Sequence, residues 1–311
     1  MTDLDLDLAC HLNVLVPDTE PGRLTEALGS LAGLGYRRVV LPPLDAERTD
    51  AAALRDLFAA HALAPITIAG QAPGADVSSA DAAEAAAGEA MLRAGVELTA
   101  ALGGDQMNGV PYGLFGHPSA PLPAARLDAA ARAVGRVADY AHEQGVMMTF
   151  EVLNRYETSV VNTAQQAMDF VARSGSDHLR IHLDTFHMAV EEADLAAAVR
   201  TALPKLGYLE LGQSGRGALG SGAVDIPALI ARAIDDGYAG RWGVEAFSRS
   251  VLAEPAADML AIWRDPFHDG AALAEDAIRV IRRGWAGSAA GRRHDRIARG
   301  GIPRAQAAPG R

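Results

Sequence analysis

Four carboxylates follow apolar, strand-like runs in the second half of the chain, at intervals of about one strand–helix unit. They are Glu151 in MMTFEVLNRYE, Asp184 in RIHLDTFH, Glu210 in LGYLELGQSGR and Glu245 in WGVEAFS. A carboxylate next to a buried strand is costly to bury unless a cation accompanies it. Several oxygen ligands in one place are typical of a hard divalent cation such as Mn²⁺ or Mg²⁺. We therefore expect these four side chains to share one metal site.

Each carboxylate also has an ordinary structural explanation. Asp184 is placed to cap the helix that follows it, and Glu245 is placed to pair with Arg241. Four carboxylates at corresponding positions of consecutive units favour a common site over four separate explanations.

Three histidines lie near these motifs. His187 follows Asp184 by three residues, where it is placed to reach a substrate oxygen. His182 alternates with Asp184, so it is expected to face inward one layer lower, as a hydrogen-bonded core residue. His11 follows Cys10 of the first predicted strand. The sequence leaves open whether His11 lines the same site.

The elements that position these residues alternate regularly between strand and helix. Eight strand–helix units with parallel pairing predict a single (β/α)8 TIM barrel of the α/β class, with an open doubly wound sheet as the alternative. In such a barrel the catalytic groups lie at the carboxyl ends of the strands. The predicted strands cover residues 8–15, 38–41, 65–69, 100–102, 146–152, 178–183, 207–211 and 241–245.

The chain divides into a barrel over residues 1–286 and a tail over residues 287–311. The tail holds six arginines against one aspartate and shows no apolar periodicity, so we expect a disordered, solvated basic terminus.

Composition excludes several classes of protein. The net charge of −11 opposes nucleic-acid binding, which needs basic density. Cys10 is the single cysteine, so no disulfide framework or paired-cysteine zinc site is possible. The acidic start MTDLDLDLA is unlike a signal peptide, and no apolar run reaches the roughly 18 residues of a membrane span. We expect a cytoplasmic protein that binds neither membrane nor nucleic acid.

The motifs EVLNRYE, HLDTFHM, SGRGALGSG, WGVEAFS and MLAIWRD, within about residues 103–283, resemble the ketose 3-epimerase family. That family includes the D-tagatose, D-allulose and L-ribulose 3-epimerases within the xylose-isomerase-like TIM barrels. The resemblance implies a divalent metal, with Mn²⁺ expected and Mg²⁺ or Co²⁺ as alternatives. It also implies a sugar substrate and a homo-oligomer, either a dimer or a tetramer.

The resemblance also implies roles for individual residues. Glu151 and Glu245 would be metal ligands and the two acid/base groups, with Asp184 as a third ligand. Two carboxylates on opposite sides of a sugar exchange the proton beside a ketone, while a metal stabilises the enediolate oxygens. The residues expected to hold substrate hydroxyls and the carbonyl oxygen are Glu157, His187 and Arg216.

The seventh strand departs from the family pattern H-x-H-x-x-E-x-x-R. The same register reads Tyr208, Glu210, Gln213 and Arg216, so only the arginine is retained. Glu210 would replace a histidine ligand, which adds negative charge to the site and raises the pKa of at least one carboxylate. Gln213 would remove a further substrate-binding or charge-balancing group.

These observations predict a metal-dependent epimerase or isomerase of a ketose or keto-sugar, acting through a metal-stabilised enediolate. A lyase related to inosose dehydratases or C-glycoside-cleaving enzymes is an alternative, because it begins with the same proton abstraction. A non-catalytic sugar-binding relative is a second alternative. A DNA endonuclease is disfavoured by the acidic charge, and a phosphorylated substrate by the absence of an evident Gly-rich phosphate loop.

Overall fold

The computed structural model describes residues 6–298 and contains one eight-stranded parallel sheet in the order β1 to β8. The sheet closes on itself because Leu8 forms a bridge with Trp242, and the Trp242 N–H donates to the Asp7 carbonyl at 2.9 Å. The strands are β1 (Ala9–His11), β2 (Arg38–Val40), β3 (Ala64–Ala69), β4 (Gln106–Gly109), β5 (Met147–Val152), β6 (Arg180–Asp184), β7 (Leu206–Gly212) and β8 (Arg241–Glu245).

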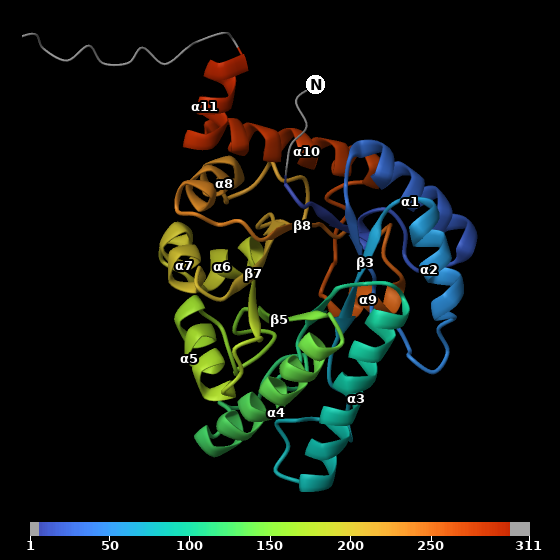
Figure 1. Ribbon diagram of the computed structural model, residues 1–311, viewed down its shortest axis with the longest axis vertical. Helices are drawn as coiled ribbons and strands as arrows, with labels where there is room; N and C mark the ends of the chain where they lie inside the picture. The colour runs from blue at the N-terminus through green and yellow to red at the C-terminus, as the bar shows by residue number, and fades with distance from the viewer. Residues whose placement is uncertain (1–5, 299–311) are drawn as a thin grey trace, which may run out of the picture.

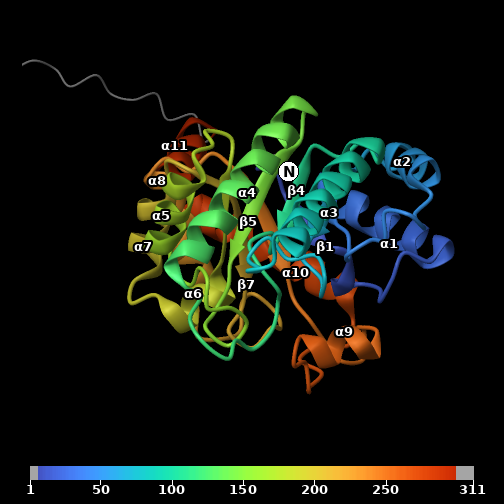
Figure 2. The same ribbon diagram turned by 90° about the horizontal axis from the view of Figure 1, so that it is seen from below.

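Helices surround the strands (Figure 1), which confirms the predicted (β/α)8 barrel over the open sheet. The helix α9, which follows β8, stands apart from this ring (Figure 2). Within residues 6–298 no helix has the length and apolar character needed to cross a membrane. The helices are η1 (Leu12–Val14), α1 (Pro21–Leu34), α2 (Ala51–Ala60), α3 (Ala82–Ala101), α4 (Ala124–Glu143), α5 (Ala164–Ser174), α6 (Thr185–Glu191), α7 (Leu195–Ala202), α8 (Ile226–Asp235), α9 (Glu254–Met259), α10 (Gly270–Gly287) and α11 (Ala289–Ala298).

The fourth strand was predicted at the wrong position. Residues 100–102 were expected to form it. Instead, Ala100 and Ala101 are the last residues of helix α3, and Leu102 is its C-cap. The strand lies in the following loop sequence, QMNG, whose Gln106 and Asn108 are buried. The Asn108 amide oxygen is satisfied inside the barrel, because Gln106 and Thr149 both donate to it, at 2.6 and 2.9 Å, whereas Asn108 Nδ2 has no hydrogen-bond partner within residues 6–298. A strand with polar buried residues lacks the apolar pattern used to find it.

The expected disordered tail is also partly wrong, because residues 289–298 form α11. One distant group and one local group explain this helix. The Asp235 side chain accepts from the Ala289 N–H at 2.7 Å, and the Ser288 hydroxyl accepts from the Gly291 N–H at 3.0 Å. Both bonds satisfy N–H groups at the helix start, and the one to Asp235 is a contribution that the tail's own composition does not show. Residues 299–311 lie outside the described residues.

An ion-pair network joins four chain segments at the amino ends of the strands. Arg241, the first residue of β8, donates twice to Asp105, at 2.6 and 3.0 Å. Arg38, the first residue of β2, also contacts Asp105, and its Nε lies 2.9 Å from Asp7. Burial alone would raise the pKa of Asp105, but the two guanidinium groups hold it below its usual value. Asp105 therefore links β2, β4 and β8 as an ionised carboxylate.

We expect Asp105→Asn to lower the free energy of unfolding by about 1–2 kcal/mol, because two mostly buried arginines lose a charged partner. Asp56→Asn is the control, since Asp56 is 76% exposed and makes a long contact of 3.4 Å with Arg55. This substitution should lower the free energy of unfolding by less than about 0.5 kcal/mol. Urea denaturation followed by circular dichroism measures both. Equal midpoints for the two variants would contradict the structural role of the network.

Candidate metal centre and active site

The chemistry-bearing residues converge at the carboxyl ends of five strands. Glu151 is on β5, Asp184 ends β6, Glu210 is on β7 and Glu245 ends β8. His11 ends β1, which closes the barrel beside β8. Donor atoms of these residues fall into three overlapping groups, within each of which the atoms lie less than 4.8 Å apart: His11, Glu210 and Glu245; Glu151, Asp184 and His187; and Glu151, His182 and Glu210. The four predicted carboxylates are thus brought together, each next to at least one cationic or histidine side chain.

Arg216 joins two of the carboxylates. Its Nη1 donates to Asp184 Oδ2 at 3.0 Å and also to Glu245 Oε2. Its guanidinium lies 3.6 Å from the ring centre of Phe186, a cation–π contact that fixes its plane. Asp184 Oδ1 accepts from the Phe186 N–H at 2.9 Å and thereby caps α6, as expected. The other oxygen, Oδ2, is the one that contacts Arg216.

A strained loop positions Arg216. The residue has φ of 56°, a left-handed conformation that is uncommon for a non-glycine residue. Its N–H donates to the Gln213 carbonyl and its own carbonyl accepts from the Phe247 N–H, both at 2.8 Å. The loop after β7 is therefore fastened to the end of β8, and this fastening aims the guanidinium at the carboxylates.

Gln213 holds the same loop from inside. Its amide nitrogen donates to the carbonyls of Leu219 and Val224 at 3.1 and 3.0 Å. Its amide oxygen accepts from the N–H groups of Ser214 and Val224 at 2.8 and 2.9 Å. The Gln213 side chain is fully buried. The sequence analysis interpreted this position as the loss of a substrate-binding or charge-balancing group. In the structure the Gln213 amide is a clip: it holds the loop closed by donating to two carbonyls and accepting from two N–H groups.

His187 faces Glu151 in a defined tautomer. Its Nδ1 faces two donors, the Asn154 backbone N–H at 3.1 Å and the Asn154 side-chain amide at 2.8 Å, and these favour the ring proton on Nε2 over the single, longer contact of Arg216 Nη2 with Nε2 at 3.3 Å. The Nε2 atom lies 3.3 Å from Glu151 Oε1 and 3.6 Å from Asp184 Oδ2. Burial lowers the pKa of His187 to about 4, so the ring is neutral and presents one N–H donor to the site.

Glu157 lies at the edge of this group. Asn154 Nδ2 donates to Glu157 Oε1 at 2.9 Å, and Glu157 Oε2 is 4.0 Å from His187 Nε2. The Glu157 side chain keeps 24% of its surface exposed. Asn154 thus orients both His187 and Glu157. The sequence analysis missed Asn154, although its position just after β5, inside EVLNRYE, was the available signal.

Glu210 sits among histidines instead of beside Arg216. Its Oε1 is 2.9 Å from His11 Nε2 and accepts from the Tyr208 hydroxyl at 3.2 Å, and its Oε2 is 3.1 Å from His182 Nε2. His11 Nδ1 also lies 3.5 Å from Glu245 Oε1. His182 is buried one layer below Asp184, as its alternation predicts, and His11 is placed in the site, which settles the alternative that the sequence left open.

Burial and neighbouring charge give the four carboxylates different pKa values. Burial raises the pKa of Glu245 to about 7 and that of Asp184 to about 6, although Arg216 opposes both shifts. Burial likewise raises the pKa of Glu151. Burial alone would raise the pKa of Glu210 too, but the adjacent imidazoles hold it below its usual value. Glu210 is thus a fixed negative charge, while the raised pKa values of Asp184 and Glu245 let these two groups exchange protons more readily near neutral pH.

The surroundings fit a divalent cation. Glu210 Oε2, His11 Nε2 and both ring nitrogens of His182 are buried without a hydrogen bond to any described residue. Glycines leave room beside the carboxylates: a Cβ on Gly212 would lie 2.6 Å from Asp184 Oδ1, and one on Gly243 would lie 2.4 Å from Glu210 Oε1. Carboxylate oxygens with unpaired imidazole nitrogens form a donor set suited to a first-row divalent metal.

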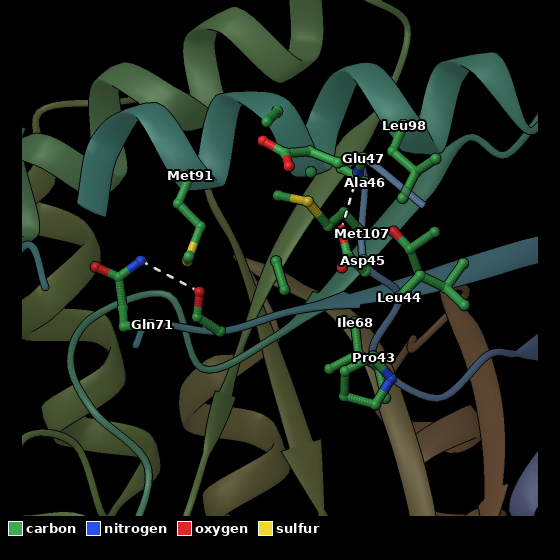
Figure 3. A pocket seen from close by; sticks show the side chains of 15 residues that line it. Pro43, Leu44, Asp45, Ala46, Glu47, Ile68, Gln71, Met91, Leu98 and Met107 are labelled. Atoms are coloured by element: carbon green, nitrogen blue, oxygen red, sulfur yellow. Dashed lines mark hydrogen bonds between the residues drawn. The ribbon is translucent and has the colours of Figure 1, made fainter. Parts of the chain in front are cut away.

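A cavity of about 580 Å³ lies elsewhere, between α3, the end of β3 and the segment after β2 (Figure 3). Met91 and Leu98 enter it from α3, and Leu44 and Ile68 line the opposite side. None of the predicted ligands or substrate-binding residues lines this cavity. The convergence of charged groups, not the cavity, therefore marks the candidate site.

Comparison with known proteins agrees with this barrel and its acidic site. Residues 30–283 match the sequence profile of the xylose isomerase-like TIM barrels. The chain is 35% identical over 277 residues to a ketose 3-epimerase of Arthrobacter globiformis, covering 89% of this chain and 96% of that protein. It is 33% identical over 280 residues to an L-ribulose 3-epimerase of a Methylomonas species, covering 89% and 97%.

A solved structure extends the likeness to three dimensions. The D-allulose 3-epimerase of a Methylomonas species, in complex with D-allulose, superimposes with a TM-score of 0.85 at 32% identity and covers 89% of this chain and 96% of its own. Fold and site together define a xylose isomerase-like barrel with a candidate buried His/Glu metal site. Within that class, the chain belongs to the ketose 3-epimerase family.

The Gln213 clip gives a direct test of the loop. We expect Gln213→Glu to lower the free energy of unfolding by about 2–3 kcal/mol, because a carboxylate oxygen replaces the amide donor facing two buried carbonyls. Gln144→Glu, at an exposed helix end, is the matched control and should change it by less than about 0.5 kcal/mol. Thermal and urea unfolding measure the difference. A Gln213→Glu protein as stable as the control would contradict the clip.

Proposed function

We propose that the protein epimerises a ketose at the carbon beside its carbonyl, with a divalent metal ion bound among the four carboxylates. The observation that carries the proposal is the shared centre formed by Glu151 from β5 and Glu245 from β8. Both contact the same small group of residues around Asp184: His187 faces Glu151 and Asp184, while Arg216 bridges Asp184 and Glu245. Family membership supports the same assignment.

The proton chemistry needs one base and one acid. One of the two carboxylates, Glu151 or Glu245, removes the proton from C3, and the electron pair enters the C2–C3 bond as charge moves to O2. The other group, in its carboxylic acid form, returns a proton to the opposite face of C3. A carboxyl group that holds or releases a proton near neutral pH suits this exchange, and burial gives Glu245 such a pKa.

Donor groups around the carboxylates complete the scheme. The neutral His187 presents Nε2–H, and Arg216 presents a permanent charge, so both are suited to the oxygens on which negative charge develops. Glu157, with part of its surface exposed, is placed to accept a hydrogen bond from a substrate hydroxyl. Asn154 orients two of these groups without contacting the reacting carbon itself.

The proposed metal ligands are Glu151, Asp184, Glu210 and Glu245, with Mn²⁺ as the proposed ion. Bound there, the cation supplies positive charge opposite the oxygens of the developing enediolate. The mixed oxygen and nitrogen surroundings of Glu210 favour Mn²⁺ or Co²⁺ over Mg²⁺, which prefers oxygen ligands. The cytoplasmic location expected from the sequence stays a prediction.

Isotope exchange tests the reaction directly. In D2O with Mn²⁺, the protein should incorporate one deuterium at C3 of a ketose and form the C3 epimer. Glu151→Gln and Glu245→Gln should each lower kcat by roughly 10²–10⁴-fold, because each removes a proton-transfer group. Glu143→Gln, on the exposed end of α4, is the matched control.

Mass spectrometry and NMR of the product separate the alternatives. An eliminated water or a cleaved glycosidic carbon bond would identify a lyase. Sugar binding without any exchange, over a broad panel of ketoses and 3-keto-sugars and with metal bound, would identify a non-catalytic protein and refute the proposal.

We further propose a homo-oligomer, as the family resemblance implies. Trp263, Met259 and Tyr156 are 66%, 59% and 62% exposed, and apolar side chains this exposed support a surface covered by a second copy. We expect Trp263→Ser combined with Met259→Ser to shift the mass measured by light scattering towards the monomer. Ile297→Ser, which alters a 64% exposed side chain on α11, should leave the mass unchanged. A monomeric wild-type protein would contradict the proposal.

A further inference from the structure

We propose that His11, from β1, is a nitrogen ligand of the cation. The site would then draw on the first strand of the barrel as well as on β5 to β8. This inference rests on the proposed metal dependence but concerns a residue outside the four carboxylates assigned to the metal above.

The backbone aims His11 into the site. Side chains alternate along β1, and Ala9 packs inside the barrel with Val40, Ile66 and Tyr208. His11, two residues later, therefore also faces inward, at the carboxyl end of the strand. Because β1 closes the barrel against β8, the imidazole is brought beside Glu245.

The ring contacts two carboxylates from two different strands. Its Nε2 lies 2.9 Å from Glu210 Oε1, and its Nδ1 lies 3.5 Å from Glu245 Oε1. One donor atom from each of the three residues fits within 4.8 Å. A cation among these three residues would have one ring nitrogen and one oxygen from each carboxylate within reach.

Apart from its contact with Glu210, the Nε2 atom of His11 has no polar partner among the described residues. His11 is 6% exposed, and its Nε2 makes no hydrogen bond despite the short contact to Glu210. A buried polar atom left unsatisfied costs about 1–3 kcal/mol, so such an atom calls for a reason. Coordination to a metal supplies one, because an imidazole nitrogen binds a cation through the same lone pair.

The other two histidines of the site are less suited. His187 Nδ1 is occupied by the Asn154 N–H, and its Nε2 carries the ring proton. His182 lies within 4 Å of a single carboxylate, Glu210, and its ring packs against Tyr208 with 4.8 Å between ring centres. His182 is therefore the natural control: it is buried and has a donor atom within 4.8 Å of Glu151 and Glu210, but it lies one layer below the carboxyl ends of the strands, where His11 lies.

Pulsed electron paramagnetic resonance of the Mn²⁺-loaded protein tests the proposal without measuring activity. We expect a coupling from one directly bound ¹⁴N in the wild type, and its replacement by a ¹⁵N coupling when histidine is supplied as the ¹⁵N form. The coupling should vanish in His11→Gln and persist in His182→Gln. A wild-type spectrum without a bound nitrogen overturns the proposal, as does a coupling lost only in His182→Gln.

Metal titration gives a second measurement. His11→Gln should raise the Kd for Mn²⁺ and Co²⁺ roughly 10-fold or more, and the Kd for Mg²⁺ less, because Mg²⁺ gains little from nitrogen. Equal weakening for all three ions would contradict ligation by His11. The isotope labelling needs no variant, so a His11→Gln protein that fails to fold leaves the test intact. A nitrogen-free site in an enzyme that still epimerises with Mn²⁺ overturns the His11 proposal and leaves the proposed function standing.

Discussion

Buried negative charge at the carboxyl ends of β5 to β8 is the constraint on which the rest of the site depends. Glu151, Asp184, Glu210 and Glu245 lie close together in a region from which water is largely excluded. Like charges at such distances raise each other's pKa and cost stability unless positive charge is placed among them. The arrangement of the surrounding residues follows from this requirement: each carboxylate has a cationic or histidine neighbour within 4 Å.

Those neighbours come from parts of the chain that only the closed barrel brings together. Arg216 depends on a loop in left-handed conformation, which Gln213 and the Phe247 N–H hold in place. His11 depends on the pairing of β1 with β8. The opposite end of the barrel contributes to the same geometry, because Arg241 at the start of β8 is fixed by Asp105 while Glu245 ends that strand. Stability at one end thereby supports alignment at the other.

The sequence predicted the features that local pattern determines. A carboxylate after an apolar strand is visible in one dimension, so Glu151, Asp184 and Glu245 could be placed at the barrel mouth before the structure was known. The strand β4 was misplaced because its buried residues are polar, with amide oxygens that accept hydrogen bonds from side chains of β5 and β8. The helix α11 was missed because one of its capping groups, Asp235, lies 54 residues away along the chain. Partners distant in sequence leave no local signal.

The difference between the expected and observed surroundings of Glu210 has the same origin. In the sequence, a glutamate in place of the family's histidine on the seventh strand reads as added negative charge in the site. In the structure, imidazoles from β1 and β6 stand beside that glutamate and keep it ionised. The chain thus places the carboxylate on β7 and an imidazole on β1, and both kinds of donor remain in the site. Strands β7 and β1 lie on either side of β8 in the closed barrel, which brings Glu210 Oε1 within 2.9 Å of His11 Nε2, so the negative charge added on one strand is balanced by a side chain on another.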